Sequence, residues 1–319
     1  MKIKSFIRRF LLVTSTAVFV ASMVTGCKFG ISQARTNNLY KQTSSDTTGK
    51  QNANQQKTME QYQSLLENNA SLIEIANFMD GNVSLVSSDN AVAMVDEFEK
   101  RQKEFLPELE KKFSENVDIQ NKMAETFLQD FDISKIYSIE DEKIQELLKE
   151  TKDSGYKVET AEGMFFPVIN YEAYKKFRDF VSNDFRDYID LMAIESNNTP
   201  AKDAALIISW EEILKRALNQ EKFIAQYPDS KRIDNVKGLY KKYLTFTLFG
   251  LNNTPLFSYD SNEIDSEAKQ AYMEVLKTNA DNSNYLAILS DYMSLLEENN
   301  YKLTDEIIKY RDEVIKKLD

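Results

Sequence analysis

Glycine and proline are scarce in most of this chain, and their scarcity limits the folds that it can adopt. Residues 58–319 contain only five of the eight glycines, together with all five prolines. Folds that alternate strands and helices need many tight turns, in which these two residue types are concentrated. We therefore predict an all-α fold for this segment, either a helical bundle or an irregular helical-repeat array. Because 42% of the chain is hydrophobic, such a fold can build a sizeable core.

Apolar side chains recur at helical spacing along several stretches of residues 58–319. The pattern predicts a first helix over 58–80, which Gly81 ends, and a second helix from Ser88. Pro107 should kink or divide the second helix, because proline has no N–H group and its ring clashes with the preceding turn. Two further helices are expected over 139–151 and 170–196.

The alternation typical of strands occurs in one short stretch, 156–169. Its two arms flank Ala161, Glu162 and Gly163, which suit a tight turn. We therefore predict one small β-hairpin here. Two interpretations remain open for Phe165 and Phe166 on its second arm: they cap the helical core, or they form part of a binding surface.

The single tryptophan, Trp210, follows Ser209 at the start of a predicted helix. Ser209 and Glu212 have the spacing of a capping box, which marks a helix N-terminus. A tryptophan in the first turn can anchor packing or offer a flat surface for a sugar ring. With both roles open, we include Trp210 with Phe165 and Phe166 in a candidate binding surface.

The first 26 residues have the parts of a secretory signal. Lys2, Lys4, Arg8 and Arg9 form a basic head without an acid, and a mostly apolar run follows over 10–24. The stretch 10–26 is too short and too rich in serine and threonine for a spanning helix, which needs about 20 apolar residues. We therefore predict that this segment is an export signal.

The end of this leader, Val24-Thr25-Gly26-Cys27, resembles the lipobox of bacterial lipoproteins. The resemblance implies that residues 1–26 form a cleaved signal peptide and that Cys27, the only cysteine, is the lipid attachment site. In that family a diacylglyceryl group is attached to the sulfur, and the new amine can carry a further acyl chain such as palmitate. Two or three acyl chains suffice for a lasting membrane anchor.

The same resemblance implies a location on the extracytoplasmic face of a bacterial cell membrane. In two-membrane bacteria an aspartate after the lipidated cysteine can retain such proteins at the inner membrane. Lys28 stands at that position here. We therefore expect the outer membrane where the organism has two membranes.

Composition divides the mature chain into two parts. Residues 27–57 are expected to form a lipidated cysteine and a flexible polar linker, because 16 of the 30 residues from Lys28 are Ser, Thr, Asn or Gln. Residues 58–319 are expected to form the helical domain, with subdomains 58–154 and 170–319 as one option. This domain carries 31 basic and 50 acidic residues, so an anionic surface should repel it.

The C-terminal third contains a pattern displaced by 52 residues. Tyr240 then aligns with Tyr292, and Leu244 aligns with Leu296, as expected for two stacked helical pairs. Residues 221–230 resemble the end of a helix in tetratricopeptide-like helical-repeat lipoproteins, which are interaction scaffolds. True repeats and an ordinary helical bundle both remain open here.

Histidine is absent from the chain. Its absence excludes Ser-His-Asp and Cys-His catalysis and every His-ligated metal site. No Gly-rich phosphate loop is present either. We therefore predict no catalytic residue, no metal site and no cofactor. With a net charge of −11 and no basic patch of domain size, we also expect no nucleic-acid partner.

These features favour a non-enzymatic, lipid-anchored binding module of the bacterial cell envelope. Its partners would be the membrane, through Cys27, and an envelope protein or polymer. One alternative is a solute-binding lipoprotein that delivers a ligand to a transporter. A less favoured alternative is a carboxylate-dependent hydrolase of wall glycans, which needs two carboxyl groups across a cleft.

Overall fold

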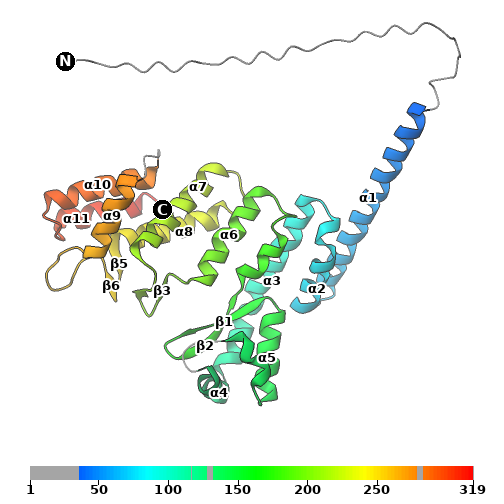
Figure 1. Ribbon diagram of the computed structural model, residues 1–319, viewed down its shortest axis with the longest axis horizontal. Coiled ribbons are helices and arrows are strands. Elements are labelled where there is room, and N and C mark those ends of the chain that lie inside the picture. The colour runs from blue at the N-terminus through cyan, green and yellow to red at the C-terminus, as the bar shows by residue number, and fades with distance from the viewer. Residues whose placement is uncertain (1–35, 116, 128–131, 279–282, 319) are drawn as a thin grey trace, which may run out of the picture. The chain divides into compact units, whose positions relative to one another are not determined.

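The computed structural model describes residues 36–115, 117–127, 132–278 and 283–318, and helices dominate this part of the chain (Figure 1). The only strands among these residues form small antiparallel pairs. The predicted all-α fold is confirmed. The described residues from 51 onward form one compact unit. No helix of the described residues has both the length and the apolar character needed to cross a bilayer.

The N-terminal helices differ from the predicted ones at their boundaries. Helix α1 (Thr36–Glu67) begins inside the segment that we expected to be a flexible linker. The helix predicted over 58–80 is split, because a turn separates α1 from α2 (Leu72–Asn82). Ser71 explains the split: its side chain accepts the Glu74 N–H, and Glu74 accepts the Ser71 N–H in return, which starts a new helix.

Helix α3 (Ser88–Ser114) contains Pro107 and is not divided by it. Phe98 and Leu109 are buried on either side of the proline, so packing holds both halves of the helix. A short 3₁₀ turn precedes α3, and two helices and a second 3₁₀ turn follow it. Their bounds are η1 Val83–Leu85, α4 Val117–Phe127, η2 Ile133–Ser138 and α5 Glu142–Asp153.

The predicted hairpin is confirmed as β1 (Tyr156–Ala161) and β2 (Met164–Ile169), which pair antiparallel. Glu162 and Gly163 make its turn with φ of 51° and 74°, as in the two-residue turns that suit the twist of a hairpin. Gln120 of α4 extends the ladder: it donates to the Phe165 carbonyl and accepts the Phe165 N–H, each at 2.8 Å.

The helix predicted over 170–196 is two elements, η3 (Tyr171–Phe177) and α6 (Asn183–Asn197). Ser182 stands at the N-cap of α6, so the chain turns before the second element begins. One hydrophobic core extends from Tyr62 in α1 to Ala193 in α6. The subdomain boundary that we placed between 154 and 170 therefore falls inside this core.

A second core begins at Trp210 and ends at Val314. Two units of a hairpin followed by two helices build most of it (Figure 1). The hairpins adjoin, because the Asn253 N–H donates to the Ala204 carbonyl at 2.8 Å. The bounds are β3 Ala201–Lys202, β4 Ala205–Leu206, α7 Trp210–Gln226, α8 Ile233–Phe249, β5 Gly250–Leu251, β6 Thr254–Pro255, α9 Ser266–Thr278, α10 Asn284–Glu298 and α11 Asp305–Lys316.

A buried ion pair joins the first core to the loop before α8. Glu99 of α3, with 1% of its side chain exposed, contacts Arg232 at 2.8 Å. Its carboxylate also accepts from Lys103 at 2.7 Å, from the Tyr171 hydroxyl at 2.5 Å and from the Tyr188 hydroxyl at 3.0 Å. The Arg232 guanidinium lies over the Tyr188 ring, 4.8 Å from its centre.

This arrangement lowers the pKa of Glu99 below its ordinary 4.5. Burial alone would raise this pKa, but the Arg232 charge, Lys103 and the Tyr171 hydroxyl outweigh burial. Because folding lowers the pKa, the carboxylate stabilises the fold above about pH 4.5. This contribution is lost as the pH falls through the folded-state pKa.

Replacing Glu99→Gln should lower the free energy of unfolding at pH 7 by about 3 kcal/mol, because it leaves a buried cation without one of its partners. It should also flatten the loss of stability as the pH falls below about 4.5. Urea unfolding across this range measures both effects. Glu110→Gln, an exposed change on the same helix, should stay within about 0.5 kcal/mol. Equal losses for the two variants would contradict this role for Glu99.

Candidate functional site

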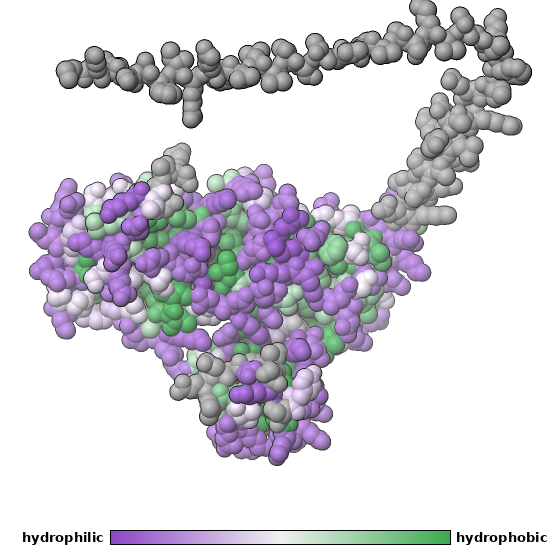
Figure 2. Space-filling model, viewed as in Figure 1, coloured by the Kyte–Doolittle hydropathy of each residue, from purple (hydrophilic) through white to green (hydrophobic). Residues whose placement is uncertain are grey.

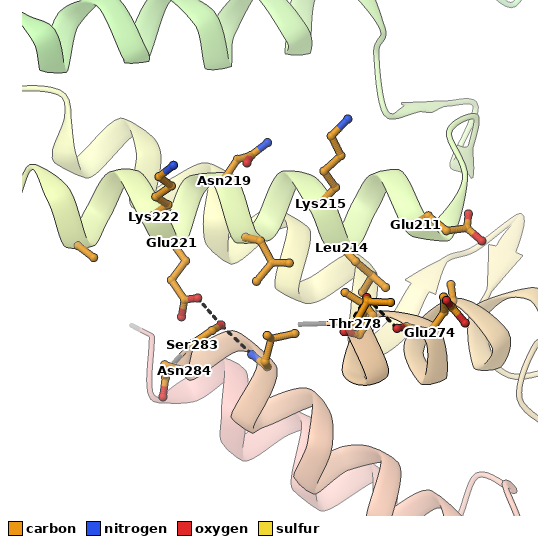
Figure 3. Close-up of a pocket in the computed structure, with 15 residues that line it drawn as sticks. Glu211, Leu214, Lys215, Asn219, Glu221, Lys222, Glu274, Thr278, Ser283 and Asn284 are labelled. Atoms are coloured by element: carbon orange, nitrogen blue, oxygen red, sulfur yellow. Dashed lines mark hydrogen bonds between the residues drawn. The ribbon is translucent and has the colours of Figure 1, made fainter. Parts of the chain in front are cut away.

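A groove of about 810 Å³ lies between α7, α9 and the N-terminus of α10. Figure 2 shows hydrophobic side chains exposed among hydrophilic ones over the C-terminal helices, and Figure 3 shows the groove in close-up. Apolar side chains from all three helices form its floor. They are Leu214, Leu218, Ala225, Ala271, Val275 and Leu286.

The floor follows from helical spacing. Leu214, Leu218 and Ala225 lie on one side of α7 because residues four and seven apart share a helix face. Ala271 and Val275 have the same relation on α9. The groove therefore lies between apolar stripes that face each other across the two helices.

The opposite side of α7 is held by a buried guanidinium. Arg216, with 3% of its side chain exposed, contacts Glu195 at 3.3 Å and Glu212 at 2.9 Å. It also donates to the Tyr243 hydroxyl at 2.9 Å. Burial, together with the Glu195 charge, raises the pKa of Tyr243, so its hydroxyl stays protonated. Lys242 completes the cluster at 2.7 Å from Glu195, and the cluster joins α6, α7 and α8.

Trp210 sets the distance between α7 and α9. Its ring meets Tyr272 of α9 edge to face, with 6.1 Å between centroids. Both side chains are buried. The aromatic contact thus holds the first turn of α7 against α9 at one end of the groove.

Lysines line one edge of the groove. Lys215, Asn219 and Lys222 project from the same side of α7 in Figure 3. Lys215 has a single exposed contact, 3.4 Å from Glu212, and Lys222 forms no ion pair with any described residue. Lys222 can therefore meet a ligand directly, and Lys215 can do so by exchanging one exposed contact.

Carboxylates occupy the other edge and the ends. Glu274 of α9 and Glu211 of α7 line the groove. Glu221 points toward α10 in Figure 3, where it accepts the Tyr285 N–H at 2.7 Å and a hydrogen bond from the Ser283 hydroxyl. Ser283 is the N-cap of α10 and accepts the Leu286 N–H, so Glu221 adds a second acceptor at this helix end from a different helix. The positive end of the α10 dipole stabilises its negative charge.

The Glu221 charge also reaches Tyr240. Burial, with the Glu221 charge as a second cause, raises the pKa of Tyr240 to about 12. This phenol therefore stays neutral beside the groove. In the described ranges, the groove included, no group of three or more His, Cys, Asp or Glu side chains is placed to hold a metal ion.

Two of the three aromatic residues in the candidate binding surface are buried. Phe165 is 3% exposed and packs on Phe127, 6.1 Å between ring centroids. Trp210 is 5% exposed, so both residues are packing anchors. Phe166 is half-buried on the other face of the hairpin. Cys27 lies outside the described residues.

The groove residues were missed by the sequence interpretation. One signal was present: apolar residues of α7 occupy more than one face, with Ile213 and Ala217 in the core and Leu218 in the groove. A helix that is apolar on two faces has two neighbours or an open binding face. Spacing alone could not tell these cases apart.

Comparison with protein-family models, with curated proteins and with solved structures found no match. The groove therefore has to be interpreted from its own chemistry.

Glu221→Ala should lower the free energy of unfolding by about 1–2 kcal/mol, because it removes the acceptor of the Tyr285 N–H and of the hydroxyl of the N-cap Ser283. Lys222→Ala, one residue further and without a described ion pair, should change it by less than about 0.5 kcal/mol. Urea unfolding measures both, and hydrogen exchange should show faster exchange at the Tyr285 and Leu286 amides in Glu221→Ala alone. Unchanged protection at these amides would contradict the cap.

Proposed function

We propose that this chain is a lipid-anchored lipoprotein of the bacterial cell envelope and acts as a non-enzymatic binding module. The proposal for the anchor rests on the leader and on Val24-Thr25-Gly26-Cys27, which resembles a lipobox. The mature chain would begin at Cys27 and lie on the extracytoplasmic face of the membrane. In a two-membrane organism it would lie in the outer membrane.

The groove between α7, α9 and α10 is the observation that carries the binding role. It combines an apolar floor with lysines that have few or no described partners. Apolar surface with a charged rim is typical of a site that another molecule covers. An envelope protein or polymer would bind here. A nucleic acid is a poor candidate, because residues 58–319 carry 50 acidic groups against 31 basic ones.

Capture of a small solute is a second candidate. It is favoured by the volume of the groove, about 810 Å³, which lies within the usual range for small-molecule sites. The protein would then deliver its ligand to a transporter.

Cys27→Ala should release the protein from membranes, because Cys27 is the only cysteine available for acylation. We expect the unchanged chain, expressed in a bacterium, to be cut before Cys27 and to sediment with membranes. The N-terminal peptide, measured by mass spectrometry, should carry acyl chains. A chain that keeps residues 1–26, or an unmodified Cys27, would contradict the proposed anchor.

A photoreactive amino acid at Lys215 should crosslink to a discrete protein in cells that make this chain. Lys237, exposed on α8 and absent from the groove lining, is the matched control position. Crosslinks from Lys215 alone would support a protein-binding groove. If neither position captures a protein, the binding role for proteins fails, and the solute candidate takes its place.

A further inference from the structure

We propose that the groove holds an amphipathic helix of a partner protein, with acidic residues along the flank that faces Lys215 and Lys222. This inference rests on the proposed binding role and specifies the chemistry of the partner. Three observations carry it: a helix of this chain in a neighbouring groove, the length of the open groove, and the charges along its edges.

Helix α11 shows how the C-terminal core accepts an amphipathic helix. Ile307 and Val314 of this 12-residue helix are buried in the second core. Tyr310 between them stacks on Tyr292 of α10, with 5.7 Å between ring centroids, and donates to the Ile288 carbonyl at 3.0 Å. The apolar residues of α11 are thus three and four positions apart, the pattern of a helix lying in a groove.

The groove of α7, α9 and α10 offers a second surface of this kind. Its lining on α7 runs from Glu211 to Ala225. At a rise of 1.5 Å per residue, this stretch is about 21 Å long, which matches a helix of about 14 residues. Its floor is apolar, as an incoming apolar stripe requires, and α11 is not among the elements that line it.

The charges along the edges select the flank of the incoming helix. Lys215 and Lys222 stand seven residues apart, two turns along the same edge of α7. Acidic residues of the partner, also two turns apart, would meet both lysines. Glu274 on the opposite edge disfavours acids there. The lysine edge is distinctive because the surrounding domain is strongly acidic.

The test uses the chain from Lys28 onward, which keeps every described element and removes the anchor. Two fluorescein-labelled peptides of 14 residues serve as probes, both with an Ala-rich helical background and a Leu stripe at helical spacing. One carries Glu along one flank of the stripe, and the other carries Lys at the same positions. Fluorescence anisotropy at about 0.15 M salt screens long-range repulsion by the acidic domain, because the Debye length is then about 8 Å.

We expect the Glu-flanked peptide to bind at least about tenfold more tightly than the Lys-flanked one. This preference opposes the net charge of the domain, so only a local basic site produces it. Lys215→Glu with Lys222→Glu should reverse the preference. Lys231→Glu with Lys237→Glu, an equal change of charge at exposed sites outside the groove, should retain it. Circular dichroism checks that both double variants stay folded.

Binding of neither peptide, or equal binding of both, would overturn the proposal. The same response to both pairs of lysine substitutions would also overturn it, because binding would then follow net charge. The proposed function is tested separately: a crosslink from Lys215 in cells combined with no peptide preference keeps the binding module and excludes the acidic-flanked helix.

Discussion

The contact of Glu99 with Arg232 is the interaction on which the rest of the structure depends. Ionised side chains are costly to bury unless each finds a partner, and here α3, η3, α6 and the loop before α8 all supply groups around one carboxylate. The loop that connects α7 to α8 is thereby tied to the first core.

Arg216 fixes α7 in a similar way, as a buried charge with partners on neighbouring helices. Its contacts with Glu195 of α6 and Tyr243 of α8 orient α7 between its two neighbours. The Arg216 side of α7 faces α6 and α8. Leu214 and Leu218 lie on the other side of the helix and therefore face α9 and α10. The groove is thus a consequence of how α7 is fixed, and Glu221 links it to the cap of α10.

These features combine into one proposal for how the protein works. A lipid anchor at Cys27 would confine the chain to a membrane surface, where the acidic domain is repelled by anionic headgroups. That repulsion would hold the domain away from the surface and leave its groove accessible. Binding at the groove would then bring a partner to the membrane without any chemical step.

The sequence by itself determined the helical character and the hairpin, and the anchor at Cys27 stays a prediction. Scarce glycine and proline, strand alternation around Gly163, and the residues before Cys27 are local patterns, and local patterns persist whatever the tertiary contacts. The sequence did not determine where α1 begins, the turn that Ser71 starts, or the break before α6. Such boundaries depend on caps and packing that compete within a few residues.

Only the tertiary structure decided which aromatic and charged residues are accessible. From the sequence, both a surface and a core were open for Phe165 and Trp210, and contacts with Phe127 and Tyr272 place both inside. The groove emerges from three helices that lie far apart in sequence. Spacing along one helix shows which residues share a face, but the partner of that face is set by long-range packing, which the local pattern does not contain.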